Sequence, residues 1–157
     1  MRILLQRVSE GRVLINDQTV AQIKQGLTLL LGIHKYDQAK DVDYLVEKCL
    51  NLRVFEDNNG KMNLSIIDIN GEILIVSQFT LYAETRKGRR PGFSESARPE
   101  VAIPLYQDFI EKIKQKMGKV EVGRFGADMK VDLINDGPVT IMIDSEDKYP
   151  KIGINNE

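Results

Sequence analysis

The chain has 157 residues, of which 42% are hydrophobic and 29% charged, and its formal net charge is −1 with a pI near 5.9. This length and composition suit one globular domain, residues 1–157, and the charge argues against a protein that coats nucleic acid by overall basicity. No apolar run approaches the ~20 residues that span a bilayer, the N-terminus lacks a signal-peptide pattern, and the single cysteine excludes an intrachain disulfide, which together predict a cytoplasmic protein without membrane contact.

Apolar patterning predicts four strands in the first 33 residues. They cover residues 2–8, 11–15, 19–23 and 27–33. The turn residues Asn16-Asp17-Gln18 join the second strand to the third as a hairpin. The fourth strand is apolar throughout, which is typical of a strand that is buried on both faces.

A first helix is predicted over residues 37–52, with Asp37 as its N-cap. Its apolar stripe consists of Val42, Leu45, Val46, Cys49 and Leu50. Because Cys49 lies inside this stripe, we interpret it as a small core residue rather than a catalytic thiol. Residues 54–55 are then extended, 56–61 form a polar loop, and a strand over 64–69 ends at Asn70-Gly71, a strong hairpin signal.

Residues 71–83 form the stretch around which the chain is organised. Their first half is apolar on both faces and predicts a buried strand. This strand is expected to continue without a turn into three hydrogen-bonding side chains, Ser77, Gln78 and Thr80. Because a buried polar group without a partner costs roughly 1–3 kcal/mol, such a cluster is either well paired or ready for a ligand. A strand end that emerges into solvent is the alternative.

The second half of the chain begins with the basic run Arg86-Lys87-Gly88-Arg89-Arg90, which is either a solvated loop or a local RNA contact. A second helix has an apolar stripe from Leu105 to Met117 and is expected to begin near Pro104 or to bend there. Further strands are predicted over residues 120–122, 128–134 and 139–143, followed by a polar C-terminal tail over 145–157. The fold class is therefore α+β, with curved, barrel-like, mostly antiparallel sheets and two helices packed outside.

Several chemistries are excluded by the residues present. One histidine and one cysteine do not make a standard structural zinc site, and no phosphate-binding or dinucleotide-binding glycine loop is present. His34 follows a buried strand, and we expect it to serve a loop or capping role. No cofactor and no metal are implied. The remaining neutral polar groups and main-chain amides suit hydrolysis of a substrate that is already activated, such as an aminoacyl ester of a ribose.

Two motifs in order, Ser77-Gln78-Phe79-Thr80-Leu81 and Asn135-Asp136-Gly137-Pro138-Val139-Thr140, resemble those of the D-aminoacyl-tRNA deacylase (D-tyrosyl-tRNA deacylase) family. Residues 123–131, with Phe125, Ala127 and Met129, and the segment Gln6-Arg7-Val8 are also similar to that family. The resemblance extends from Met1 to about Asp144. It implies a cofactor-free hydrolase of the ester between tRNA and a D-amino acid, or glycine mischarged on tRNA-Ala, acting as a homodimer with active sites at the subunit interface.

The resemblance also implies roles for individual residues. Ser77, Gln78, Phe79 and Thr80 would line the pocket for the aminoacyl end, and main-chain amides there would stabilise the oxyanion. In the family, the residue that matches Thr80 has been assigned as a nucleophile. Because the sequence shows no base beside it, we favour a positioning role for Thr80 and a hydroxyl of the RNA as the group that assists hydrolysis. Arg86, Lys87, Arg89 and Arg90 would contact RNA.

Gly137-Pro138 matches the family's Gly-cis-Pro element, which reaches into the partner subunit's pocket and rejects L-amino acids. Arg7 matches the residue that holds this element, and Met129 is expected at the pocket wall, with Phe125 and Ala127 nearby. From the residues alone, a plain turn between two strands is the better interpretation of Gly137-Pro138, since only ~5% of X-Pro bonds are cis. Two other functions also stay open, namely a non-catalytic module that binds the tRNA acceptor end and an esterase or amidase for small D-amino acid derivatives.

Overall fold

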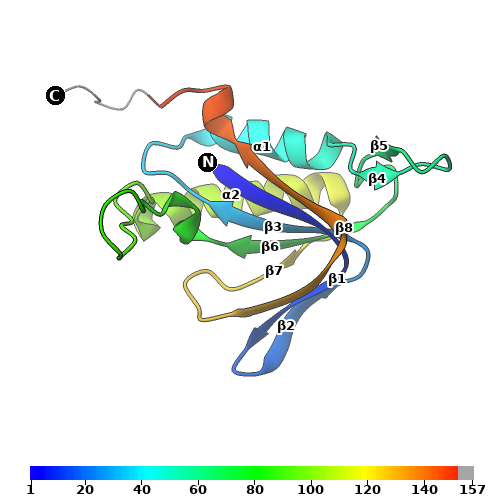
Figure 1. Cartoon of the computed structure of the whole chain (residues 1–157), viewed down its shortest axis with the longest axis horizontal. Helices are drawn as coiled ribbons and strands as arrows, with labels where there is room; N and C mark the ends of the chain where they lie inside the picture. Colours follow the sequence, from blue (N-terminus) through cyan, green and yellow to red (C-terminus); the bar gives the residue numbers. More distant parts are fainter. Residues whose placement is uncertain (152–157) are drawn as a thin grey trace.

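The computed structural model describes residues 1–151, which form one six-stranded sheet, a small two-stranded sheet and two α-helices (Figure 1). The strands of the large sheet follow the order β2-β1-β3-β6-β7, and β8 pairs with β1. Their bounds are β1 Arg2–Ile15, β2 Gln18–Ile23, β3 Gly26–Gly32, β6 Glu72–Ser77, β7 Glu121–Val122 and β8 Lys130–Asp144. The small sheet pairs β4, Phe55–Glu56, with β5, Met62–Leu64.

β1 is one continuous strand, so the prediction of separate strands over residues 2–8 and 11–15 is wrong. Its first half pairs with β3 and its second half with β2, while β8 runs along both halves. The β1–β8 register shifts between Gln6 and Val8 and again between Val8 and Glu10. Such bulges increase the local twist of a strand and bend it. The sheet therefore curves into the expected barrel-like shape.

The Asn70-Gly71 hairpin was predicted wrongly, because residues 65–70 form turns and not a strand. The hydroxyl and backbone N–H of Ser65 both donate to a carboxylate oxygen of Asp68 at 2.8 Å, which holds the turn closed. Ile66 is fully buried in this turn, and such apolar residues are what suggested a strand. β6 instead pairs in parallel with β3, and β7 in parallel with β6, whereas the other strand pairs are antiparallel.

The helix α1 covers Ala39–Asn51, and Gln38 occupies its N-cap in place of the predicted Asp37. Asp37 is instead buried, and its carboxylate accepts hydrogen bonds from the amino group of Met1 and from the backbone N–H of His34, both at 2.6 Å. The N-terminal turn is stabilised by Asp41, whose carboxylate accepts a 2.9 Å hydrogen bond from the backbone N–H of Gln38. Asp37 therefore connects the first strand to the start of α1.

The helix α2 runs over Pro99–Met117, so of the two expectations, a start near Pro104 or a bend there, the first is wrong. Pro104 lies inside the helix and lacks the N–H that would bond to the carbonyl of Glu100. Both Pro104 and Glu100 are exposed, so water can satisfy the carbonyl that proline leaves free. Gly118 ends the helix with a positive φ of 79°, as its position in the sequence predicts.

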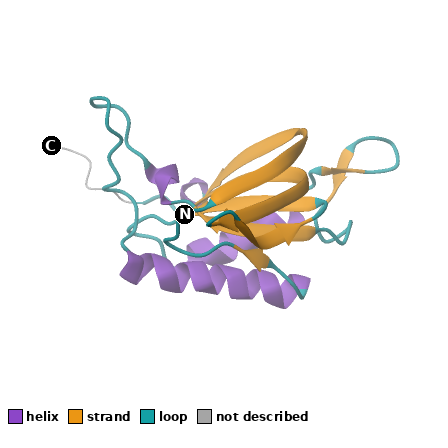
Figure 2. Cartoon of the chain, turned by 90° about the horizontal axis from the view of Figure 1, so that it is seen from below, coloured by secondary structure: helices purple, strands orange, loops and turns teal. Residues whose placement is uncertain are grey.

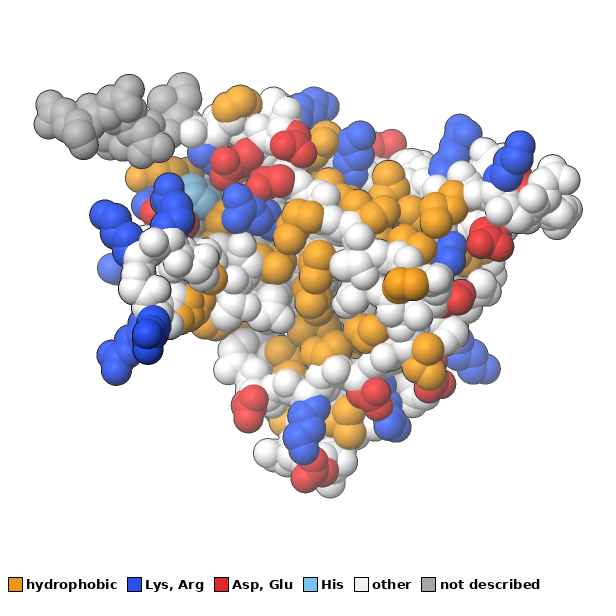
Figure 3. All heavy atoms as spheres, in the orientation of Figure 1, with side chains coloured by type: hydrophobic (Ala, Val, Ile, Leu, Met, Phe, Trp, Pro, Cys, Tyr) orange, Lys and Arg blue, Asp and Glu red, His pale blue; other side chains and the backbone are white. Residues whose placement is uncertain are grey.

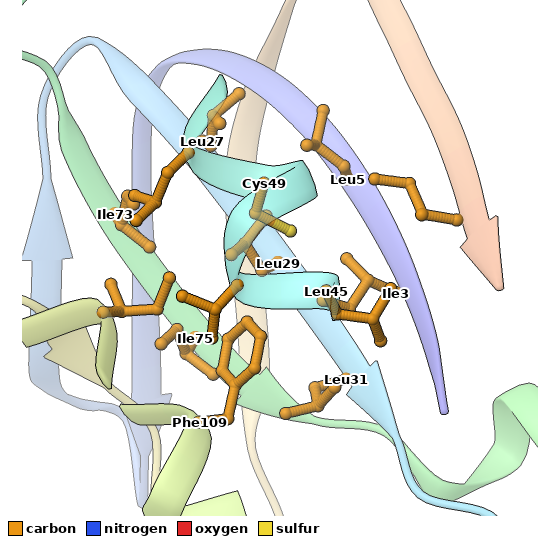
Figure 4. Packing of buried hydrophobic residues seen from close by; sticks show 14 of the residues in the cluster. Ile3, Leu5, Leu27, Leu29, Leu31, Leu45, Cys49, Ile73, Ile75 and Phe109 are labelled. Atoms are coloured by element: carbon orange, nitrogen blue, oxygen red, sulfur yellow. The ribbon is translucent and has the colours of Figure 1, made fainter. Parts of the chain in front are cut away.

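Both helices cover the same face of the large sheet (Figure 2), and the main core lies between them and the strands. Figure 4 shows how the sheet residues Ile3, Leu5, Leu27, Leu29, Leu31, Ile73 and Ile75 pack against Leu45, Cys49 and Phe109 of the helices. Cys49 is fully buried, which raises the pKa of its thiol far above the usual value and confirms its predicted core role. The fold class, α+β with two helices outside a barrel-like sheet, is also confirmed.

The opposite face of the sheet carries no helix and shows apolar side chains over its middle (Figure 3). The side chains of Ile134 and Met142 on β8 are 54% and 51% exposed. Neither α1 nor α2, the α-helices of residues 1–151, is long and apolar enough to cross a membrane.

The first seven residues of the predicted C-terminal tail are anchored to the domain. Ser145 is fully buried, and its hydroxyl donates to the carboxylate of Asp41 at 2.6 Å while it accepts from the Met1 amino group at 2.7 Å. The ammonium of Lys151 pairs with Asp37 at 2.9 Å and also with Asp41. The rest of the predicted tail, 152–157, lies outside the described residues.

Candidate active site

The central polar cluster lies where two parallel strands, β3 and β6, end side by side. β6 stops at Ser77, and the short 3₁₀ helix η1, Phe79–Tyr82, follows at once. The expectation that the strand continues through Thr80 is therefore wrong. The backbone N–H of Gln78 donates to the carbonyl of Leu31 at 2.8 Å, which ties the turn to the end of β3. Because ligands of open sheets with parallel strands bind outside the carboxyl ends of those strands, this position suits a site.

A pocket of about 80 Å³ opens at this strand end. It is lined by Leu31, Ile33, Ser77, Gln78, Phe79, Ser96, Ala97, Ala102, Phe125 and Gly126. None of these lining residues is ionisable, and the polar side chains are those of Ser77, Gln78 and Ser96. The lining comes from the ends of β3 and β6, the loop before α2 and the start of that helix, and the loop before β8. The pocket is thus apolar, with a few neutral hydrogen-bonding groups.

The side chains of the first motif are arranged around this pocket. The amide nitrogen of Gln78 donates to the hydroxyl of Thr80, which is exposed and lies outside the pocket lining. Phe79 is 56% exposed, and its ring meets the ring of Phe93 edge-on with 5.0 Å between centroids. The structure therefore brings Ser77, Gln78 and Phe79 together and positions Thr80 beside them.

Two main-chain N–H groups at the start of η1 are available to a ligand. The first hydrogen bond of η1 is donated by the backbone N–H of Leu81 to Gln78 at 3.2 Å. The N–H groups of Phe79 and Thr80 precede this bond and donate to no group within residues 1–151. They therefore supply two donors next to the pocket without any charged side chain.

The second motif lies inside β8, so the predicted strands over 128–134 and 139–143 are parts of one strand that begins at Lys130, and the alternative of a plain turn between them is wrong. The Gly137-Pro138 peptide bond is cis, as expected. Asn135 holds the segment from one side, because its side chain accepts from the Val139 N–H at 2.7 Å and donates to the Thr140 hydroxyl at 2.8 Å. Both Gly137 and Pro138 are exposed.

Arg7 holds the same segment from the other side. Its Nε donates to the carbonyl of Asp136 at 2.8 Å, and its Nη1 donates to the carbonyl of Val54 at 2.6 Å. The side chain is buried, so the hydrogen bond to Val54 is shielded from water and the one to Asp136 is partly shielded. Gly137 has a φ of 135°, and a Cβ at this position would lie 2.8 Å from Nη2 of Arg7. The backbone conformation and the close guanidinium together require glycine.

Within one chain the two motifs are apart. Arg7 is opposite Leu27 in the β1–β3 register, whereas Ser77 is opposite Leu31 in the β3–β6 register. Leu27 and Leu31 are four residues apart on β3, so the position of Arg7 and the position of Ser77 are separated by about 13 Å along this strand. Neither Gly137 nor Pro138 lines the pocket beside Ser77.

The residues of the segment 123–131 are divided between pocket and surroundings. Phe125 lines the pocket, and its ring lies 5.4 Å from that of Tyr106 on α2. Ala127 donates a backbone hydrogen bond to Arg124 at 3.2 Å and does not line the pocket. The sulfur of Met129 accepts from the Arg124 N–H at 3.4 Å, and Met129 packs against the second apolar cluster of the sheet. The structure of one chain thus does not bring Met129 to the wall of this pocket.

The basic run projects on a closed loop beside the site. Glu84 and Gly92 exchange backbone hydrogen bonds of 2.8 and 2.9 Å, which close the loop at its base. The loop extends from the edge of the molecule in Figure 1, and Lys and Arg side chains gather there in Figure 3. Arg86 pairs with Glu84, and this hydrogen-bonded pair lowers the pKa of the Glu84 carboxyl to about 2. Lys87, Arg89 and Arg90 are exposed and make no ion pair within residues 1–151.

Six pocket residues were not predicted as site residues, namely Leu31, Ile33, Ser96, Ala97, Ala102 and Gly126. Gly126 belongs to the segment 123–131 that resembles the family, whereas the other five carry no chemical motif and are brought to Ser77 by the tertiary fold. The hydroxyl of Ser96 is shielded from solvent and has no hydrogen-bond partner among residues 1–151. The predicted local role of His34 is confirmed, because its Nδ1 accepts a 3.2 Å hydrogen bond from the backbone N–H of Tyr36.

Comparison with known proteins yields one consistent set of relatives. A family model described as D-Tyr-tRNA(Tyr) deacylase matches residues 4–144. A D-aminoacyl-tRNA deacylase of Clostridioides difficile is 55% identical over 149 residues, which cover 95% of this chain and 100% of the relative. A D-aminoacyl-tRNA deacylase of Thermosipho africanus is 56% identical over 146 residues, which cover 93% of this chain and 98% of the relative.

Two solved structures are similar to the whole domain. One, a c-Myc DNA unwinding element binding protein, superimposes with a TM-score of 0.87 at 39% identity and covers 92% of this chain and 98% of its own. The other, a probable eukaryotic D-amino acid tRNA deacylase, has a TM-score of 0.80 at 21% identity, with 91% and 98% covered. At this low identity the second structure supports the fold alone.

Proposed function

The chain belongs to the D-Tyr-tRNA(Tyr) deacylase family, as its two motifs predicted, and we propose that it hydrolyses the ester bond of D-aminoacyl-tRNA to release a free D-amino acid and tRNA. The observation that supports this most is the pocket at the ends of β3 and β6, which combines an apolar lining with neutral donors and main-chain amides. We further propose that it acts in the cytoplasm, without a cofactor, and also cleaves glycyl-tRNA that carries glycine on tRNA-Ala.

The proposed chemistry needs no ionisable side chain at the reacting atoms. Water attacks the ester carbonyl, the bond to the ribose oxygen breaks, and that oxygen takes a proton. The free N–H groups of Phe79 and Thr80 are placed to stabilise the oxyanion, and one such donor contributes roughly 3–4 kcal/mol in known hydrolases. Thr80 acts as a positioning residue, because its hydroxyl already accepts from Gln78 and no base lies beside it. The neighbouring ribose hydroxyl assists the proton transfer.

Stereochemical selection is assigned to Gly137-Pro138 acting as a main-chain gate. An enzyme that accepts many D-amino acids has to read the geometry around one carbon, and rigid backbone atoms suit this task better than mobile side chains. The hydrogen bonds from Arg7 and Asn135 make this segment rigid. An L-side chain would clash with the gate, whereas a D-side chain would point away from it. Glycine has no side chain to clash, which is why we propose glycyl-tRNA as a second substrate.

The gate needs a second copy of the chain. Gly137 and Pro138 are exposed and lie about 13 Å along β3 from the pocket of their own chain. The uncovered face of the sheet, with the exposed side chains of Ile134 and Met142, supplies an apolar surface for such a partner. We therefore propose a homodimer in which each pocket receives the gate of the other subunit.

One experiment separates this function from its alternatives. Purified protein is incubated with D-tyrosyl-tRNA and L-tyrosyl-tRNA, and loss of the ester is followed with time. The proposal expects loss of the D-ester alone. Binding without hydrolysis of either ester would indicate a module that only binds the acceptor end. Cleavage of small D-amino acid esters without cleavage of D-tyrosyl-tRNA would indicate a small-molecule esterase.

A further inference from the structure

A second and larger cavity lies on the other side of η1 from the pocket. Its volume is about 280 Å³. It is lined by Arg2, His34, Tyr36, Tyr82, Ala83, Glu84, Arg86, Glu95, Glu146 and Lys151, and we call it the Tyr36 cavity. The proposed hydrolysis does not use it.

The short helix η1 connects the Tyr36 cavity to the pocket. Phe79, the first residue of η1, lines the pocket, and Tyr82, its last residue, lines the cavity. Three residues of 3₁₀ helix rise by about 6 Å. This is close to the length of two stacked nucleotides, at roughly 3.4 Å each along one strand. A nucleic acid whose end occupies the pocket can therefore reach the cavity within a few nucleotides.

Tyr36 supplies the exposed aromatic surface of the Tyr36 cavity, whereas His34 and Tyr82, which also line it, are only 5% and 4% exposed. Tyr36 is 53% exposed at its rim, and its ring centroid lies 5.5 Å from that of His34. His34 in turn lies 5.1 Å from the ring of Tyr82, and the guanidinium of Arg2 lies 4.5 Å above the Tyr82 ring. Aromatic rings and guanidinium planes are the surfaces on which unpaired RNA bases stack.

The charges of the Tyr36 cavity argue against a phosphate as its occupant. Each lining arginine or lysine already has a carboxylate partner, since Arg2 pairs with Asp144 at 2.6 Å, Arg86 with Glu84, and Lys151 with Asp37 at 2.9 Å. Phosphate recognition needs cations that are free to bind it. A neutral ligand is therefore the better match for these walls.

Glu146 and Tyr82 each carry a polar group of the lining that has no partner within residues 1–151. The carboxylate of Glu146 receives neither a hydrogen bond nor an ion pair there. The hydroxyl of Tyr82, a residue that is only 4% exposed, is buried without a hydrogen-bond partner. A carboxylate accepts hydrogen bonds from amino groups such as those on base edges, and a tyrosine hydroxyl both donates and accepts. A nucleobase carries hydrogen-bond donors and acceptors on its edge, which match these two protein groups, and a flat face that can stack on an aromatic ring.

We propose that the Tyr36 cavity holds an unpaired nucleobase of the tRNA acceptor end, upstream of the terminal adenosine, stacked on Tyr36 and hydrogen-bonded to Glu146. This inference rests on the proposed function, because the aminoacylated end has to occupy the pocket beside Phe79. The loop with Lys87, Arg89 and Arg90 lies next to the cavity, since Arg86 of the same loop lines it. Those free cations then meet the phosphates that connect the bound nucleotides.

The test compares two substrates that share the same ester. One is D-tyrosyl-adenosine, and the other is a D-tyrosyl trinucleotide with the 3′-terminal sequence of tRNA. The proposal expects the wild-type protein to have a higher kcat/KM for the trinucleotide. Tyr36→Ala should lower kcat/KM for the trinucleotide by about 5- to 150-fold, the range for losing one stacked base, and leave D-tyrosyl-adenosine within about twofold.

Tyr36→Phe serves as the matched control, because it keeps the ring and should retain most of the advantage of the trinucleotide. Glu146→Gln, a second variant, should lower kcat/KM for the trinucleotide only. Equal kcat/KM of wild-type protein on both substrates, or an equal loss on both in Tyr36→Ala, would overturn the inference. Unchanged kcat/KM on both substrates in Tyr36→Ala would also overturn it. Wild-type protein without activity on either substrate would instead contradict the proposed function.

Discussion

The Nε of Arg7 donates a 2.8 Å hydrogen bond to the carbonyl of Asp136, so a buried arginine on β1 holds the residue that precedes Gly137-Pro138. The same guanidinium donates to Val54 at 2.6 Å, and its Nη2 lies 2.8 Å from the position that a Cβ on Gly137 would take. Arg7 therefore ties the proposed gate to β1 through the hydrogen bond to Asp136, and the hydrogen bond to Val54 holds the guanidinium itself in place. Because reactions in well-oriented sites lose about a hundredfold when a group moves by ~1 Å, the gate should depend on this residue.

The first prediction concerns Arg7. Arg7→Met removes both hydrogen bonds, and it should lower D-tyrosyl-tRNA hydrolysis at least tenfold or reduce the preference for the D- over the L-ester. Rates on both esters and a thermal unfolding curve measure the change. Each lost buried hydrogen bond should also cost roughly 1–3 kcal/mol in stability. Arg12→Met is the control, because Arg12 lies on the same strand but pairs with Asp132 at an exposed position. Unchanged rate and selectivity in Arg7→Met would contradict the assigned role.

The second prediction separates positioning from nucleophilic catalysis at the pocket. Thr80→Ala should reduce deacylation only moderately, because the Thr80 hydroxyl is not required to form a covalent bond. Gln78→Ala should do more harm, since Gln78 lines the pocket and also donates to Thr80. Single-turnover kinetics and mass spectrometry of quenched reactions test both statements. A covalent D-aminoacyl adduct on Thr80 would disprove the positioning role.

The third prediction concerns the basic loop. Replacing Lys87, Arg89 and Arg90 with glutamine should weaken tRNA binding and flatten its dependence on salt, by up to about 0.7–0.9 in the logarithmic slope per phosphate contact. Hydrolysis of D-tyrosyl-adenosine should be unaffected. The control replaces three exposed helix lysines, Lys40, Lys48 and Lys114, and changes the net charge equally. A similar effect of both triple variants would mean that the loop has no specific contact with RNA.

The fourth prediction is a pH dependence of stability at Asp41. Burial alone would raise the pKa of this carboxyl, but hydrogen bonds from Lys151, Ser145 and the Gln38 backbone outweigh it and hold the pKa below its ordinary 3.8. A carboxyl with a lowered pKa in the folded state stabilises the protein above its ordinary pKa, and this contribution is lost as the pH falls through the lower value.

Asp41→Asn should therefore reduce the free energy of unfolding at pH 7 and flatten its decline in acid below about pH 4. Chemical denaturation between pH 7 and pH 2 measures both effects. Asp43→Asn is the control, because Asp43 is exposed on the same helix. A variant at Asp41 that keeps the wild-type slope in acid would show that other carboxyls control acid unfolding.

The sequence correctly predicted those strands and helices whose pattern of apolar residues is set by burial in the core. The apolar residues of β3 and β6 and the stripe that contains Cys49 were assigned correctly, because strands and helices buried in a core repeat with fixed periods. Errors arose where residues of a turn have the apolar pattern of a strand, or where residues inside a strand have the composition of a turn. Ile66 is buried in a turn and resembles a strand residue, and Ser9-Glu10-Gly11 resembles a turn although β1 continues through bulges.

The candidate site was predicted in its motifs but not in its assembly. The motif with Ser77 and the motif with Gly137 were found from their residues. No sequence pattern, however, predicts that Ser77 lies beside one end of β3, whereas Arg7, which holds the motif with Gly137, lies beside the other end. Ser96 and Gly126 reach the pocket only through the packing of α2 and the loop before β8. Asp37 was read as a helix cap, because its partners, Met1 and Lys151, are distant in the sequence.

The most direct test of a site built from two chains is a mixture of two defective variants. Gln78→Ala disables the pocket, and Arg7→Met combined with Gly137→Ala disables the gate. After unfolding and joint refolding, a mixed dimer contains one site with an intact pocket from one chain and an intact gate from the other. Random pairing should restore D-selective hydrolysis of tyrosyl-tRNA to about one quarter of the wild-type level. A mixture that is no more active and selective than the separate variants would contradict a gate supplied by the partner subunit.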